Sequence, residues 1–141
     1  MTTLEGTVMS GLGHGAYFVG LAWVRGAIQR MLGFDPYPGT LNLRLVDGEM
    51  RAAWLDVMAG PALPLTPPPP ERCGGRLFPV VVAPDIPAAV VVPDVTVHDA
   101  DVLELVAGAH VRGRLGLHDG DRVTVHIHPG SRTAQEVEAK P

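Results

Sequence analysis

Thr40 and Asn42 lie two residues apart in the alternating stretch Thr40-Leu41-Asn42-Leu43-Arg44-Leu45. Side chains two residues apart on a β-strand point to the same face, so the hydroxyl and the amide would lie together. Neutral oxygen donors of this kind suit Mg²⁺ whose charge is already balanced by nucleotide phosphates. The same alternation is also typical of a strand that buries its leucines and exposes a polar stripe to solvent, and both interpretations stand at this point.

A glycine-rich segment, Ser10-Gly11-Leu12-Gly13-His14-Gly15, lies between two stretches that we predict as strands, residues 4–9 and 17–21. Glycines at alternate positions let backbone N–H groups approach a phosphate closely. The dinucleotide-binding fingerprint requires a helix after its glycines, so a strand at residues 17–21 argues against that fingerprint. A plain hairpin loop is the alternative to a phosphate-binding loop.

Glu104 is a carboxylate within the otherwise apolar stretch of residues 102–106. If that strand is buried on both faces, the carboxylate needs a partner or a role, such as binding a substrate hydroxyl or acting as a general base. If one face is open to water, Glu104 is simply solvated. His126 and His128 also share a strand face, but no third metal ligand is evident nearby, so we favour solvated side chains for both.

Several chemistries are excluded by composition. The chain has ten arginines and one lysine, Lys140 beside the C-terminus, so neither a P-loop lysine nor a Schiff-base lysine is expected. A bound phosphate would therefore be held by backbone N–H groups, arginine, histidine or a metal. The single cysteine, Cys73, excludes an internal disulfide and a cysteine-based zinc cluster.

The elements that must position these residues are short. Valine, 17 glycines and 14 prolines favour many brief strands joined by tight turns. Residues 61–70 contain six prolines and no charge, which predicts an extended surface connector rather than a helix or a central strand. We predict a small, mainly β, closed barrel with strands at residues 4–9, 17–21, 40–45, 77–83, 88–92, 102–106 and 122–128, and with helical segments at residues 24–32, 50–58 and 109–115.

Length and charge set the remaining expectations. A chain of 141 residues fits one domain, which we place at residues 1–130, followed by a polar, frayed tail at residues 131–141. The net charge of −4 disfavours binding to nucleic acid or to anionic membranes. No apolar run is long enough to span a membrane, and the N-terminus does not resemble a signal peptide. We expect a monomer in the cytoplasm.

Two segments together resemble the archaeal CTP-dependent riboflavin kinase family: residues 5–18, EGTVMSGLGHGAYF, and residues 32–42, LGFDPYPGTLN. Counterparts of the second half are residues 89–93, 96–98, 103–107, 111–112 and 115–121, so the resemblance spans about residues 5–128. It implies a six-stranded cradle-loop β-barrel with short helical insertions that binds CTP and a metal ion.

The resemblance also implies roles for individual positions in this sequence. The nucleotide-binding residues would be Leu12, Gly13, His14, Gly15, Ala16 and Tyr17, together with Ala109, His110, Val111 and Arg112. Thr40 and Asn42 would be the Mg²⁺ ligands, and Thr96 and Glu104 would contact the flavin substrate. Glu104 and Arg112 are the candidate catalytic residues. Arg112 would stand in for an absent lysine, because a guanidinium can bind a phosphate through two hydrogen bonds.

The expected reaction is transfer of the γ-phosphoryl group of CTP to the 5′-hydroxyl of riboflavin, giving FMN and CDP. A kinase of the same fold that acts on another small alcohol is the first alternative. A non-catalytic barrel that binds a flavin or a nucleotide is the second.

Overall fold

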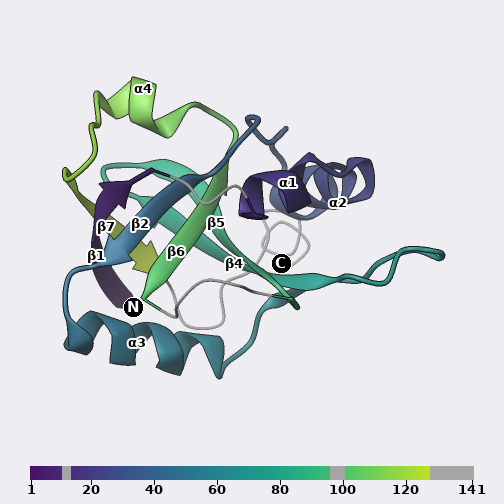
Figure 1. The fold of residues 1–141 in the computed structure, drawn as a ribbon, viewed down its shortest axis with the longest axis horizontal. Helices are drawn as coiled ribbons and strands as arrows, with labels where there is room; N and C mark the ends of the chain where they lie inside the picture. The colour runs from purple at the N-terminus through teal and green to yellow at the C-terminus, as the bar shows by residue number, and fades with distance from the viewer. Residues whose placement is uncertain (11–13, 96–100, 128–141) are drawn as a thin grey trace, which may run out of the picture.

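The computed structural model describes residues 1–10, 14–95 and 101–127 (Figure 1). The described residues form strands that are joined by turns and short helices. The helices are α1 (His14–Gly20), α2 (Ala22–Leu32), α3 (Gly48–Met58) and α4 (Val111–Leu115). The strands are β1 (Thr2–Met9), β2 (Leu41–Leu45), β3 (Leu63–Leu65), β4 (Gly75–Val82), β5 (Ile86–Pro93), β6 (Val102–Ala107) and β7 (Arg122–Ile127).

Six of the strands form a closed antiparallel barrel. The ring runs β4-β5-β6-β2-β1-β7, and it closes where Val81 and Val82 at the end of β4 pair with His126 and Val125 of β7. Closure leaves no long unpaired edge in this ring. The predicted fold class, a mainly β six-stranded barrel with short helical insertions, is therefore confirmed.

Two apolar layers stabilise the barrel, one inside it and one outside. On β6, Leu103 and Leu105 point into the barrel, whereas Val106 points outward and packs beneath α1 and α2. The α1–α2 pair lies beside the barrel in Figure 1, and α3 lies apart from it along another side. From α3, Trp54 packs edge-on against Phe78 in the inner layer, with ring centroids 5.2 Å apart.

The predicted strand at residues 17–21 is wrong, because residues 14–20 form helix α1. Aromatic and β-branched residues favour a strand locally, but Phe18 and Val19 are buried together in the outer layer, and this packing overrides the local preference. The argument against a dinucleotide-binding fold thus loses its original basis. That fold is still excluded here, because β1 pairs antiparallel with both β2 and β7 instead of joining a parallel βαβ unit.

The proline-rich segment is more ordered than predicted. Residues 63–65 form β3, which pairs with the start of β4 through Leu63–Leu77 and Leu65–Gly75. β3 lies on the same edge of β4 that β7 uses further along, so it is an edge strand, where a proline such as Pro64 is tolerated. The predicted tail at residues 131–141 lies outside the described residues. Among the helices that the structure describes, none is long and apolar enough to cross a membrane.

Candidate functional site

The polar residues predicted on separate strands meet on the face of the β2–β6 pair that points away from the barrel interior. Leu41 and Leu43 of β2 point into the barrel, so Asn42 between them points outward. Asn42 is the direct cross-strand partner of Glu104 on β6, and on its other side it pairs with Met9 of β1. Asn42 and Glu104 are 5% and 2% exposed, so neither is a solvated strand residue.

Thr40 joins this pair from the turn that precedes β2. Its hydroxyl Oγ1 donates a hydrogen bond to Oε2 of Glu104 over 3.2 Å. A hydroxyl, an amide and a carboxylate are thus gathered where β1, β2 and β6 run side by side. Sequence alternation predicted that Thr40 and Asn42 share a face, but it did not link them to Glu104.

The donor set of this cluster fits a hard cation. Mg²⁺ prefers oxygen ligands, and it is usually bound by few protein groups together with phosphate oxygens. Within the described residues no group of three or more histidine, cysteine, aspartate or glutamate side chains is placed to hold a metal. A metal at this cluster would therefore depend on the Thr40 and Asn42 oxygens and on the phosphates of a bound nucleotide.

A pocket of about 100 Å³ lies beside the cluster. Thr40 stands at its wall, and so do the segment before α4 and the first residues of that helix. The lining residues are Tyr37, Pro38, Gly39, Thr40, Leu41, Leu105, Ala107, Ala109, His110, Val111 and Arg112. All four residues of the second predicted nucleotide contact, 109–112, thus line the same pocket as the predicted metal ligand Thr40.

The turn at residues 36–39 separates this pocket from a second one of about 270 Å³. Ala16 of α1 lines the second pocket, and Tyr37, Pro38 and Gly39 line both. The ring of Tyr37 stacks on that of His110, with centroids 4.8 Å apart and planes at 16°. Ala16, from the first predicted nucleotide-binding segment, and residues 109–112 of the second therefore line pockets on the two sides of one short turn. Sequence analysis did not select Tyr37, which it included only within the segment of residues 32–42.

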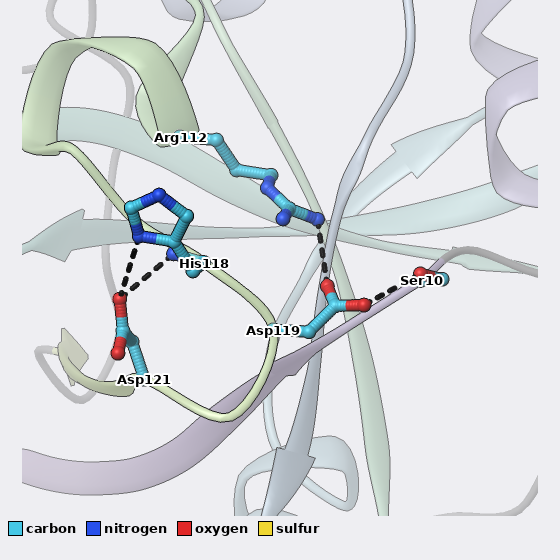
Figure 2. A network of polar contacts seen from close by, with 5 residues as sticks. All are labelled: Ser10, Arg112, His118, Asp119 and Asp121. Atoms are coloured by element: carbon cyan, nitrogen blue, oxygen red, sulfur yellow. Dashed lines mark hydrogen bonds and ion pairs between the residues drawn. The ribbon is translucent and has the colours of Figure 1, made fainter.

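Arg112 does not stand alone at the pocket. Its Nη1 donates to Oδ1 of Asp119 over 3.0 Å, and Oδ2 of Asp119 accepts a hydrogen bond from Ser10 Oγ at 2.8 Å (Figure 2). The Ser10 hydrogen bond, followed by the Arg112 hydrogen bond and charge, lowers the pKa of Asp119, although partial desolvation acts in the opposite direction. Sequence analysis included Asp119 only within the segment of residues 115–121 and missed this network.

The remaining candidates are placed less fully. Leu12, Gly13 and Thr96 lie outside the described residues, as does His128. His14 and Gly15 begin α1, and Tyr17 of that helix is 75% exposed. His126 Nδ1 is hydrogen-bonded to Thr3 Oγ1 at 3.1 Å. Among the described residues, His126 belongs to no group of three or more histidine, cysteine, aspartate or glutamate side chains that could hold a metal.

Comparison with known proteins agrees with this architecture. The family model CTP-dep_RFKase, described as domain of unknown function DUF120, matches residues 8–127. A riboflavin kinase of Aeropyrum pernix is 42% identical over 125 residues, which cover 87% of this chain and 93% of that protein. A riboflavin kinase of Saccharolobus solfataricus is 35% identical over 129 residues, covering 89% and 73%.

A riboflavin kinase of Pyrobaculum calidifontis is 41% identical over 127 residues, which cover 89% of this chain but 59% of that longer protein. The family model extends from the end of β1 through the turn before β2, β6 and α4 to the end of β7. The resemblance inferred from the sequence is thereby confirmed, and the chain belongs to the CTP-dependent riboflavin kinase family.

Proposed function

We propose that the protein transfers the γ-phosphoryl group of CTP to the 5′-hydroxyl of riboflavin, giving CDP and FMN. The observation that carries this proposal is the cluster of half-buried Thr40 with buried Asn42 and Glu104, beside the pocket that Arg112 lines. Phosphoryl transfer depends mainly on positioning and charge stabilisation, and this arrangement of side chains from β2, β6, α4 and the turn before β2 offers both. Family membership supports the choice of donor and acceptor.

Glu104 is the group that we assign to the acceptor. The residue is 2% exposed and its carboxylate accepts a hydrogen bond from Thr40, so it is oriented before any substrate arrives. It would accept a hydrogen bond from the ribityl hydroxyl while that oxygen bonds to the γ-phosphorus and the bond to the bridging oxygen of CDP breaks. The hydroxyl proton would pass to an oxygen of the transferred phosphoryl group after the new bond has formed. In a loose transition state the hydroxyl does not need to be deprotonated before its oxygen bonds to phosphorus. We therefore assign Glu104 to anchor the hydroxyl rather than to deprotonate it.

Arg112 and the glycine-rich segment are assigned to the donor. Arg112 lines the pocket, and its guanidinium has further N–H donors besides the one directed at Asp119. Residues 12–17 would contribute backbone N–H groups to the phosphates. Mg²⁺, when held by Thr40 and Asn42, would neutralise part of the phosphate charge.

The test is a steady-state assay of FMN formation with riboflavin and Mg²⁺, in which CTP, UTP, ATP and GTP are compared as donors. We expect FMN and CDP in equal amounts, with kcat/KM highest for CTP. Thermal shift with each substrate alone would report binding independently, since a ligand at about 100 times its Kd stabilises by about 2.7 kcal/mol.

Other outcomes identify the alternatives directly. Equal kcat/KM for CTP and ATP would contradict the CTP preference. Nucleotide binding without turnover of riboflavin, but with turnover of another alcohol, would indicate a same-fold kinase with a different acceptor. Binding of riboflavin or CTP with no product from any pair would indicate a non-catalytic barrel.

A further inference from the structure

The carboxylate of Asp119 joins three segments that are far apart in the sequence. Ser10 follows β1 and immediately precedes the glycine-rich segment, Arg112 belongs to α4, and Asp119 lies in the turn between α4 and β7. Each oxygen of the Asp119 carboxylate accepts one hydrogen bond. Oδ2 accepts from Ser10 Oγ at 2.8 Å, and Oδ1 accepts from Arg112 Nη1 at 3.0 Å. In Figure 2 the Asp119 carboxylate lies between these two side chains.

The turn that carries Asp119 is itself fixed to the barrel. Val8 of β1 donates its N–H to the carbonyl of Asp121 at 2.9 Å and accepts from the N–H of Gly120 at 2.8 Å. Gly120 has φ of 92°, a conformation that side chains disfavour, so the tight turn depends on it. Leu117 also donates its N–H to the carbonyl of Arg112 at 2.8 Å. Asp119 is therefore held at a set distance from both β1 and α4.

We propose that Asp119 is a positioning residue for the nucleotide, and this inference rests on the function proposed above. It restrains the side chain of Arg112, which lines the pocket, and it fixes Ser10, which precedes the glycine-rich segment in the sequence. A long arginine side chain loses rotamer freedom when it binds phosphate, and a preformed ion pair reduces that loss. Asp119 would not bind the phosphates itself, because its charge has the same sign as theirs.

This inference makes a prediction whose sign differs from that of simple electrostatics. Removing a negative charge near a phosphate site should by itself tighten nucleotide binding. If Asp119 positions Arg112 and Ser10, its removal should instead weaken binding. Asp121 provides a matched control, since it lies in the same turn and contacts His118 instead, with Oδ2 accepting from the His118 N–H at 2.7 Å.

The experiment measures the Kd of CTP with Mg²⁺, the Kd of riboflavin, and kcat for the wild type and for Asp119→Ala, Asp119→Asn and Asp121→Asn. We expect Asp119→Ala to weaken CTP binding about tenfold and to leave riboflavin binding within about twofold. Asp119→Asn should weaken CTP binding less, about threefold, because its amide oxygen can still accept a hydrogen bond from Arg112. Asp121→Asn, which removes the same charge, should bind CTP as tightly as the wild type or more tightly.

A second comparison asks whether Asp119 acts through Arg112. In an Arg112→Ala background, adding Asp119→Ala should weaken CTP binding much less than it does in the wild type.

The inference is overturned if Asp119→Ala and Asp119→Asn bind CTP within about twofold of the wild type, or if CTP and riboflavin binding fall equally. It is also overturned if the full loss persists without Arg112. Should Asp119→Ala fail to fold, Asp119→Asn and the charge-matched Asp121→Asn decide the question. A wild-type protein that binds no nucleoside triphosphate would overturn the proposed function as well.

Discussion

Asn42 and Glu104 face each other across the β2–β6 pair, and both are withdrawn from solvent. Their neighbours along both strands are mostly apolar, and a buried polar group costs free energy unless it is hydrogen-bonded. The Thr40 hydroxyl supplies one such bond to Glu104. A polar pair in a place where apolar side chains would pack well is expected where function, rather than stability alone, selects the residues.

Glu104→Gln should separate anchoring from proton transfer. The substitution keeps the size and one acceptor oxygen but removes the charge. Because we assign Glu104 to anchor the ribityl hydroxyl, riboflavin affinity should weaken by about 1–3 kcal/mol, with a smaller fall in kcat. Equilibrium riboflavin titration combined with single-turnover kinetics measures the two effects separately.

The opposite pattern would identify Glu104 as the general base. In that case kcat would fall by roughly 10²–10⁴ while riboflavin affinity would hardly change. If neither quantity changed, Glu104 would have no role in the reaction. The sequence also allowed a solvated Glu104, and its 2% exposure excludes that possibility.

Thr40→Ala combined with Asn42→Ala should abolish turnover and leave the barrel folded. Both oxygens of the proposed metal site disappear, so raising Mg²⁺ should not restore kcat. Activity should be measured across a Mg²⁺ titration, alongside thermal unfolding of the same samples.

Thr3→Ala is the matched control for the loss of a threonine hydroxyl. Thr3 also lies on the barrel and bonds His126, but it is remote in register from the β2–β6 pair. This variant should retain wild-type turnover. Near wild-type activity of the double variant at saturating Mg²⁺ would contradict the metal role of Thr40 and Asn42.

Local pattern predicted most of the strands but not which strands would be neighbours. The alternation around Asn42 correctly placed Leu41 and Leu43 in the core. The pairing of Asn42 with Glu104 joins segments about sixty residues apart, and no local periodicity carries that information. For the same reason the sequence could not decide whether Asn42 and Glu104 are buried.

Helix α1 shows a different limit. It has seven residues, too few for a helical period to be distinguished from a buried strand when Tyr17, Phe18 and Val19 all favour strands. Its helical state depends on docking Phe18 and Val19 into the outer layer. The Asp119 network was equally hidden, because a turn signal predicts where the chain reverses and not what its side chains contact.

The pKa of Asp119 predicts a pH dependence of stability. Hydrogen bonding from Ser10, with a further contribution from Arg112, lowers the pKa below the ordinary value of 3.8. A lowered carboxyl pKa means that the folded state binds the proton less readily than the unfolded state does. The interaction therefore stabilises the fold above about pH 3.8 and is lost as pH falls through the lowered pKa.

Asp119→Asn should accordingly unfold at a lower urea concentration than the wild type near pH 7, and this difference should shrink as the pH falls below 3.8. Ser10→Ala removes the largest cause of the lowered pKa but leaves the contribution of Arg112. The difference between its urea midpoint and that of the wild type should therefore also shrink as the pH falls, by a smaller amount. Urea unfolding at several pH values measures both. A gap that stayed constant over this pH range would rule out the titration of Asp119 as its cause.

Gly74→Ala should destabilise the junction between β3 and β4 without altering the site. A Cβ at Gly74 would lie 2.5 Å from the Leu65 carbonyl oxygen and 2.9 Å from Pro67 Cδ, so the backbone of the proline-rich segment must shift. We expect a loss of about 1–3 kcal/mol in the free energy of unfolding, measured by urea denaturation.

Gly48→Ala is the matched control, because nothing lies within 4 Å of its added Cβ at the start of α3. It should be neutral or stabilise by up to about 1 kcal/mol. In both variants kcat should match the wild type at temperatures where the protein is folded. If Gly74→Ala unfolded at the same urea concentration as Gly48→Ala, the close packing of Gly74 against the proline-rich segment would be refuted.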